Sequence, residues 1–236
     1  MVNYKHVLES HQKDMERRLY NANKILSIVK RFHNFNSMLD IGCGIGAWLN
    51  AASKLGVQNI KGVEGPWLKE TETLVDRKKI EVVDLSKKTF ETQQRYDLAI
   101  SIEVAEHLPE KMASNFCASL TNASDFVLFS AAIPGQGGAG HINEQYIEHW
   151  IGNFWNLGYV PLDAVRPFIQ ADKNMYWWLQ QNVVVFVSYD RFIADENLHK
   201  FAAPLSSFTR ISPIVFESKR KEIRKMKDKK EKIISS

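Results

Sequence analysis

The feature that most constrains the fold is a loop with three glycines at alternate positions, Gly42, Gly44 and Gly46. A short apolar segment, residues 37–41, precedes the loop, and a segment with helical apolar spacing, residues 47–55, follows it. Glycine suits this loop because it adopts positive φ angles and lets a ligand approach the backbone closely. A strand, a glycine loop and a helix in this order predict an α/β domain that binds a ligand at the carboxyl end of its first strand.

The alternation of strand and helix continues through the middle of the chain. Residues 97–102 and 126–132 are almost entirely apolar, as expected for central strands that are covered on both faces. We therefore expect a mostly parallel sheet with helices on both faces. Further strands are predicted over residues 60–64, 80–84, 159–162 and 183–188, and further helices over residues 68–76, 109–120, 144–157 and 174–180.

The 236 residues divide into three predicted parts. Residues 1–36 carry apolar side chains at helical spacing and are expected to cap the domain, residues 37–190 form the α/β domain, and residues 191–236 form a C-terminal extension. Residues 218–232 hold nine Lys or Arg and three acids, whereas the rest of the chain has 22 basic and 24 acidic residues. A solvated terminal helix explains this tail, and a contact with nucleic acid or an anionic surface is the alternative.

The sequence also indicates the cellular compartment in which the protein folds. Its two cysteines, Cys43 and Cys117, have no spacing that suggests a zinc site or a disulfide framework, so we expect two buried thiols in a reducing cytoplasm. No apolar run approaches the roughly 20 residues of a membrane span. The N-terminal residues lack the apolar core of a signal peptide. The oligomeric state does not follow from the sequence.

Three acids mark the carboxyl ends of the first three predicted strands: Asp40, Glu64 and Asp84. An open parallel sheet binds its ligand at this edge. Asp40 is placed to hold an ammonium group, Glu64 to accept both hydroxyls of a ribose, and Asp84 to accept from an adenine amine. A row of acids suits a cationic ligand with a free amine, such as S-adenosylmethionine.

The glycine loop by itself leaves a second interpretation open. Gly42, Gly44 and Ala47 satisfy the pattern G-x-G-x-x-G/A, and Glu64 lies at the spacing where an acid binds the ribose of a dinucleotide. A nicotinamide-dependent oxidoreductase is therefore the competing hypothesis.

Taken together, the motifs over residues 39–46, 63–64, 83–85 and 96–101 resemble the class I S-adenosylmethionine-dependent methyltransferases, and the resemblance extends over residues 37–188. It implies a Rossmann-like, seven-stranded, mostly parallel sheet whose last strand is antiparallel. It fixes the cofactor and leaves the acceptor open. The residues that it implies for cofactor binding are Asp40, Gly42, Gly44, Gly46, Glu64, Asp84, Leu85 and Ser101.

A cluster of acids and a histidine follows the fourth predicted strand: Glu103, Glu106 and His107. One turn of helix would bring these side chains toward one face. Oxygen and imidazole ligands suit a divalent ion such as Mg or Mn, which would bind an acceptor hydroxyl and lower its pKa. Without a metal, His107 or His141 would act as the general base, because imidazole titrates near neutral pH.

His141 directly follows a segment with four glycines, residues 135–140, that comes after the fifth predicted strand. This segment is expected to form a shaped or mobile lid over the same pocket. The set Glu103, Glu106, His107 and His141 resembles the metal site of small-RNA 2'-O-methyltransferases, and its first three members resemble that of metal-dependent quinone O-methyltransferases. The alternative is a surface histidine that begins the helix at Glu144.

The lid and the residues after it resemble methyltransferases of bacterial surface-glycan biosynthesis. Four tryptophans either form a stacking wall for a sugar or nucleotide or belong to the core: Trp150, Trp155, Trp177 and Trp178. We expect an O-methyltransferase that acts on a small sugar- or nucleotide-linked acceptor. RNA 2'-O-methylation is the alternative, supported by the metal-like cluster and the basic tail, and opposed by the near-neutral body and the lack of an RNA-binding module.

Overall fold

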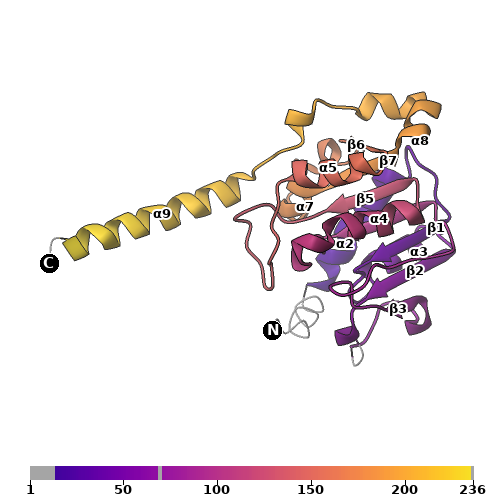
Figure 1. Ribbon diagram of the computed structural model, residues 1–236, viewed down its shortest axis with the longest axis horizontal. Coiled ribbons are helices and arrows are strands. Elements are labelled where there is room, and N and C mark those ends of the chain that lie inside the picture. The colour runs from indigo at the N-terminus through magenta and orange to yellow at the C-terminus, as the bar shows by residue number, and fades with distance from the viewer. Residues whose placement is uncertain (1–13, 69–70, 235–236) are drawn as a thin grey trace.

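The fold is a seven-stranded sheet with helices on both faces (Figure 1). The computed structural model describes residues 14–68 and 71–234, so the first part of the expected N-terminal cap lies outside the described residues. The sheet order is β3-β2-β1-β4-β5-β7-β6. The strands are β1 (Ser37–Ile41), β2 (Asn59–Glu64), β3 (Ile80–Val82), β4 (Leu98–Ile102), β5 (Phe126–Ser130), β6 (Tyr159–Leu162) and β7 (Val184–Ser188).

Pairing within the sheet confirms the expected topology. The five strands β3, β2, β1, β4 and β5 are parallel to one another, and β7 runs antiparallel to both β5 and β6. Because the strand order reverses direction between β1 and β4, the glycine loop after β1 lies at the point where such sheets bind their ligands. The sheet therefore positions the ends of β1, β2 and β4 beside one site.

The two faces of the sheet bury different layers of helices. Along β1, Met38 packs with the helices α2 and α3, whereas Leu39 and Ile41 pack with α4 and α5. This alternation follows from the two-residue period of a strand. The helices are α2 (Met15–Val29), α3 (Ala47–Lys54), α4 (Ala113–Ala123), α5 (Ile147–Asn156), α6 (Arg166–Ile169), α7 (Trp177–Asn182), α8 (Tyr189–Ala194) and α9 (Pro213–Ile234).

Several predicted helices differ from the structure, and those over residues 109–120 and 144–157 begin at Ala113 and Ile147. Among the described residues of 68–76, only Leu68 is helical, as the last residue of the 3-10 turn Pro66–Leu68, and residues 71–76 form bends and irregular chain. The helix predicted over residues 174–180 begins at Trp177 and continues to Asn182. Both cysteines are buried and unpaired, as expected. The division into a cap, a domain and an extension stays a prediction.

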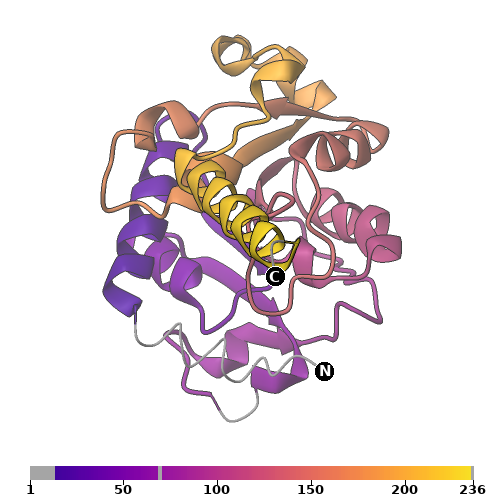
Figure 2. The same ribbon diagram turned by 90° about the vertical axis from the view of Figure 1, so that its left-hand side faces the viewer.

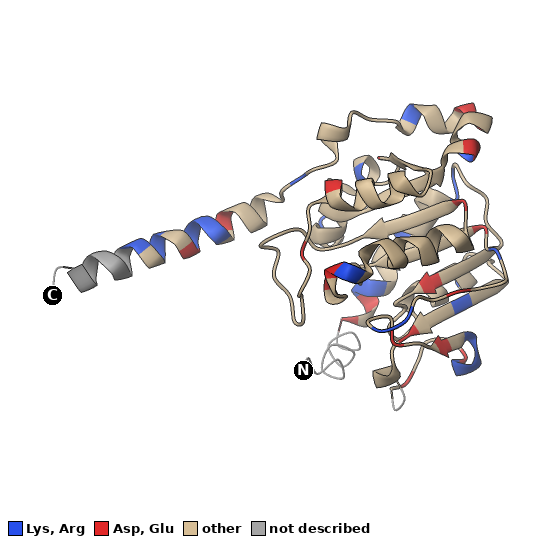
Figure 3. Cartoon of the chain, in the orientation of Figure 1, with Lys and Arg blue, Asp and Glu red and all other residues tan. Residues whose placement is uncertain are grey.

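The C-terminal helix α9 projects away from the sheet (Figures 1 and 2). Basic side chains predominate along its described part, among acids at Glu217 and Glu222 (Figure 3). Its apolar side chains Ile223 and Met226 are 54% and 72% exposed, whereas Val215 near its start is buried. Helix α9 therefore adds little to the core. In the described part of the chain, no helix is long and apolar enough to cross a membrane.

Ending the chain at Ser218 should leave the melting temperature within about 2 °C of that of the full chain, because a helix that buries so little apolar surface contributes little stability. Thermal unfolding followed by circular dichroism measures this. The shortened chain keeps the buried Phe208 and Val215. A larger drop would mean that α9 packs on the domain or on a second subunit in solution.

Candidate active site

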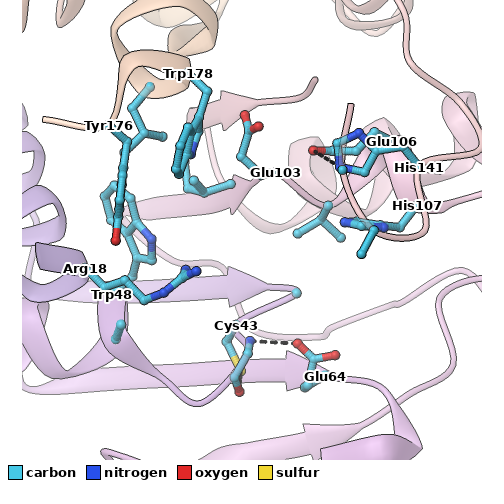
Figure 4. Close-up of a pocket in the computed structure, with 18 of the residues that line it drawn as sticks. Arg18, Cys43, Trp48, Glu64, Glu103, Glu106, His107, His141, Tyr176 and Trp178 are labelled. Atoms are coloured by element: carbon cyan, nitrogen blue, oxygen red, sulfur yellow. Dashed lines mark hydrogen bonds and ion pairs between the residues drawn. The ribbon is translucent and has the colours of Figure 1, made fainter. Parts of the chain in front are cut away.

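A cavity of about 790 Å³ opens at the carboxyl edge of the sheet (Figure 4). The glycine loop forms its floor, and the ends of β2 and β4 contribute Glu64 and Glu103. The glycine-rich segment after β5 and residues 176–179 close its other sides. The volume is sufficient for a cofactor together with part of an acceptor.

Backbone geometry explains the glycines of the loop. Gly42, Gly44 and Gly46 all have positive φ angles, of 86°, 54° and 87°. A Cβ atom on Gly42 would lie 2.3 Å from Cγ2 of Val104, in the loop after β4. Glycine at position 42 therefore lets the loops after β1 and β4 approach each other. Gly42 and Gly44 line the cavity, whereas Gly46 precedes α3 and is not among the lining residues.

The two carboxylates at the ends of β1 and β2 are both buried. Glu64 accepts hydrogen bonds from the backbone N–H of Gly44 and Gly65, each at 2.7 Å, and from the indole of Trp67 at 2.8 Å. Oδ2 of Asp40 is buried without a hydrogen-bond partner in the described part of the chain. Burial, and then the nearby Glu64 carboxylate, raise the pKa of Asp40. Asp40 is not among the residues that line the cavity, but it lies two residues before Gly42 of the glycine loop, and its unpaired buried oxygen fits the expected ammonium partner.

The other predicted cofactor residues are placed differently. Leu85 lines the cavity, but Asp84 does not, and its carboxylate accepts a hydrogen bond from Ser86 Oγ at 2.5 Å and pairs with Lys87 at 2.7 Å. Ser101 is fully buried in the sheet, where its hydroxyl donates to the carbonyl of Ile41 at 2.8 Å. Ser101 thus joins β1 to β4 rather than facing the cavity.

Three of the four predicted metal ligands come together. One ligand atom from each of Glu106, His107 and His141 lies within 4.8 Å of the others. Glu106 Oε1 is 4.0 Å from Nε2 of His141. Both carboxylate oxygens of Glu106 are buried, and neither has a hydrogen-bond partner among the described residues. Burial, reinforced by Glu103, raises the pKa of Glu106 well above its usual value.

Hydrogen bonds orient the two histidine rings. Nδ1 of His141 lies 2.9 Å from Glu144, whose carboxylate also accepts from the backbone N–H of Gly135 and Gly137. Nδ1 of His107 donates to the carbonyl of Gly140 at 3.2 Å, which places the lone pair of the neutral ring on Nε2. Burial, followed by His141, lowers the pKa of His107 to about 4, so its ring is neutral at pH 7. A neutral imidazole held by a second partner is the form that binds metals.

The glycine-rich segment is fixed to the cluster by its backbone. The N–H groups of Ile142 and Asn143 both donate to the carbonyl of Glu106, at 2.9 and 3.0 Å. A Cβ atom on Gly138 would lie 2.2 Å from Nε2 of His141, so a glycine is needed there for the ring to reach the cavity. The helix that was expected to begin at Glu144 begins at Ile147, and His141 lies in the cavity wall.

Glu103 lies outside the turn that carries its neighbours, which differs from the expectation. The 3-10 turn covers only Ala105–His107, and Glu103 has a φ angle of +55° before that turn. Its carboxylate accepts from the amides of Gln136 at 2.8 Å and Asn182 at 3.1 Å. Figure 4 shows Glu103 pointing away from the other three side chains.

The opposite wall of the cavity is aromatic. Tyr176 stacks on Trp178 with ring centroids 4.3 Å apart, and Trp48 of α3 also lines this side (Figure 4). Of the four tryptophans proposed as a stacking wall, Trp177 and Trp178 line the cavity. Trp150 is 1% exposed in the core against Phe129, and Trp155 is 59% exposed at the surface, because α5 turns its apolar face toward the sheet.

Several residues of the cavity are not predicted from the sequence. Arg18 and Asn21 come from α2, Trp48 from α3, and Gln136 from the glycine-rich segment. No motif marks them. The one available signal was the position of the α2 residues on a helix that was expected to cap the domain.

Comparison with known proteins identifies the family. A family model described as a methyltransferase domain matches residues 11–128, half of the chain, whereas no curated protein sequence matches it. The methyltransferase domain of bacterial CtHen1 has a TM-score of 0.52 and 18% identity, over 73% of this chain and 98% of that chain. DesVI of Streptomyces venezuelae has a TM-score of 0.51 and 13% identity, over 72% and 92%.

A third structure, the plantazolicin methyltransferase BpumL in complex with SAH, has a TM-score of 0.51 and 14% identity, over 78% of this chain and 90% of that chain. These three similarities establish the fold, and the family match decides against the nicotinamide-dependent alternative. The chain belongs to the class I S-adenosylmethionine-dependent methyltransferases, and S-adenosylmethionine is its cofactor.

Proposed function

We propose that the protein is an O-methyltransferase whose acceptor hydroxyl lies next to a divalent cation, Mg or Mn, held by Glu106, His107 and His141. One observation carries this proposal: the Glu106 carboxylate is buried without a hydrogen-bond partner in the described structure, beside two oriented histidine rings. A buried carboxylate of this kind is costly unless a cation compensates it. One carboxylate and two imidazoles form a ligand set that divalent cations accept.

The residues around the cavity fit the cofactor. We propose that the glycine loop, Asp40 and Glu64 hold its methionine and ribose parts, and that Leu85 contacts the adenine. S-adenosylmethionine would supply the methyl group. The acceptor oxygen would bond to the methyl carbon in line with the breaking C–S bond, so that S-adenosylhomocysteine leaves and the hydroxyl proton is released to water. Asp84 would reach the cofactor only if its contacts with Ser86 and Lys87 opened. Gly46 and Ser101 would act by shaping the loop and the sheet.

The chain's own residues prepare the acceptor for attack. Glu106 supplies negative charge that offsets a cation near the sulfonium, and the second partners of His107 and His141 hold the ring nitrogens in place. A divalent cation held by these residues would lower the pKa of an adjacent hydroxyl and orient it. Glu103, held by two amides, faces the cavity and is available to accept a hydrogen bond from another hydroxyl of the acceptor.

For the acceptor, we propose a small sugar- or nucleotide-linked compound, of the kind used in surface-glycan biosynthesis. Aromatic rings combined with carboxylate and amide groups suit a molecule with apolar faces and several hydroxyls. Tyr176 and Trp178 lie across the cavity from Glu106 and His141 (Figure 4), and Trp177 packs against Trp178, so an acceptor between the two sides would contact both.

Removing divalent cations should abolish methyl transfer, and adding Mg or Mn should restore it. The measurement is mass-spectrometric detection of a methylated product in a panel of nucleotide-activated sugars, free sugars and short RNAs, with and without a chelator. S-adenosylhomocysteine binding, measured in parallel, should survive chelation. If the chelator leaves turnover unchanged while His107→Ala removes it, the metal proposal fails and His107 is the general base.

The same panel tests the RNA alternative, for which the basic charge of α9 is the supporting observation. Methylation of a short RNA that weakens steeply with salt and on removal of α9 would favour that alternative. Methylation of sugars alone, insensitive to the loss of α9, would favour the small acceptor.

A further inference from the structure

The charges that line the cavity are unevenly distributed. Among the described lining residues, Arg18 is the single Lys or Arg, whereas Glu64, Glu103 and Glu106 are acids. Arg18 extends from α2 into the cavity, on the side of the glycine loop and Trp48 (Figure 4). Within the described lining, the Arg18 guanidinium is thus the one permanent cation that faces a site for a cofactor with a zwitterionic amino-acid end.

Helix α2 is anchored so that Arg18 has a defined position. The neighbouring Arg17 donates to the carbonyls of Asn174 and Met175, each at 3.0 Å. Asn21 accepts from the backbone N–H of Tyr176 at 2.8 Å. The guanidinium of Arg18 lies 5.9 Å from the centre of the Tyr176 ring. These contacts fix α2 against the segment that leads into α7, so the backbone of Arg18 has a defined position beside the cavity.

The Arg18 guanidinium has no hydrogen-bonded carboxylate partner among the described residues. Its Nε is buried and has no hydrogen bond within the described structure. Burial lowers its pKa, although the nearby Tyr176 and Asp14 oppose this effect. Asp14 accepts a hydrogen bond from the Tyr176 hydroxyl. A guanidinium that is partly desolvated in this way gains most from a carboxylate that accepts two parallel N–H bonds.

We propose that Arg18 binds the carboxylate at the methionine end of S-adenosylmethionine. The methionine end carries one ammonium and one carboxylate, and the buried Asp40 at the glycine loop offers an acid for the ammonium. Arg18 lines the same cavity as the loop and is the one Lys or Arg among the described lining residues. The inference rests on the established cofactor and not on the proposed metal or acceptor.

The charge balance favours this carboxylate over a phosphate of the acceptor. A diphosphate would bring at least two negative charges into a cavity whose described lining has three carboxylates and one guanidinium. Once Arg18 is paired with the cofactor, no described Lys or Arg of the lining is left for an anionic acceptor.

The test compares two ligands that differ in the methionine end. S-adenosylhomocysteine carries the carboxylate, whereas 5'-methylthioadenosine has the same adenosine and thioether but lacks the amino acid. Arg18→Met in the full chain should weaken S-adenosylhomocysteine about 10-fold to 100-fold by calorimetry and leave 5'-methylthioadenosine within about 2-fold. Arg31→Met, which removes the same charge at an exposed position just after α2, should change neither affinity.

Arg18→Lys should recover part of the lost affinity, because it restores the charge without the planar fork. An equal loss of affinity for both ligands would overturn the proposal and assign Arg18 a role in shaping the cavity. Unchanged S-adenosylhomocysteine affinity together with a raised KM for an acceptor would also overturn it, and would place an anion of the acceptor at Arg18. Because these titrations need neither metal nor acceptor, failure of the proposed function would not affect them.

Discussion

Replacing Glu106 with glutamine should lower methyl transfer about a thousandfold, because the neutral amide cannot offset the charge of a divalent cation that activates the acceptor. The affinity for Mn, measured by calorimetry, should fall with it. The affinity for S-adenosylhomocysteine should not change, because Glu106 lies on the opposite side of the cavity from Trp48 and the glycine loop (Figure 4). Glutamine has nearly the same shape, so this variant isolates the charge.

The control is Glu110→Gln, which removes an acid from an exposed position four residues further along the chain. It should leave turnover and Mn affinity unchanged. Without metal, Glu106→Gln should melt no lower than the natural chain, since it removes a buried carboxylate that has no hydrogen-bond partner in the described structure. Normal turnover in Glu106→Gln would contradict the metal proposal, and a large fall in melting temperature would show that the carboxylate stabilises the fold by itself.

Most of the fold could be predicted because its signals are local. The bounds of β1 and β6 agree with the residues expected from sequence, and the apolar runs identified β4 and β5. The antiparallel β7 came from the family resemblance. The predicted helix over residues 68–76 was wrong because Glu72, Thr73 and Asp76 stand among a few apolar residues, and helical spacing over so short a segment does not determine a helix.

The candidate site could be predicted in part, for a physical reason. Glu106, His107 and His141 come together because they follow neighbouring strands, and strand order places their loops side by side. Glu103 differs because its position depends on a left-handed backbone and on amides from distant segments. The position of Arg18 depends on how α2 packs against α3 and against residues 174–176, which no spacing within the sequence encodes.

Replacing the buried Arg166 with methionine should lower the free energy of unfolding by about 3 to 5 kcal/mol, the usual cost of removing one partner from a buried ion pair. Arg166 is fully buried, and its Nε pairs with Asp163 at 2.8 Å. Its Nη1 also donates to the carbonyls of Gln181 at 3.1 Å and Phe208 at 2.7 Å. These bonds join α6, α7 and the C-terminal extension at one point. Methionine retains the apolar stem and leaves both carbonyls without their donor.

The matched control uses the second cation on the same carboxylate. Arg210 pairs with the other oxygen of Asp163 at 2.6 Å, but its side chain is 31% exposed, so water replaces much of what the pair provides. Arg210→Met should therefore cost about 1 kcal/mol or less. Urea unfolding of the two variants measures the difference, and Arg166→Met should melt about 10 °C lower than the natural chain. Equal losses in the two variants would mean that neutralising Asp163, rather than satisfying the buried carbonyls, is what Arg166 contributes. A larger loss in Arg166→Met would instead mean that the hydrogen bonds from Arg166 to the buried carbonyls stabilise the fold. One of these carbonyls belongs to Gln181 of α7, the helix that begins with Trp177 and Trp178 of the aromatic wall. Arg166 would then support this wall although it does not line the cavity.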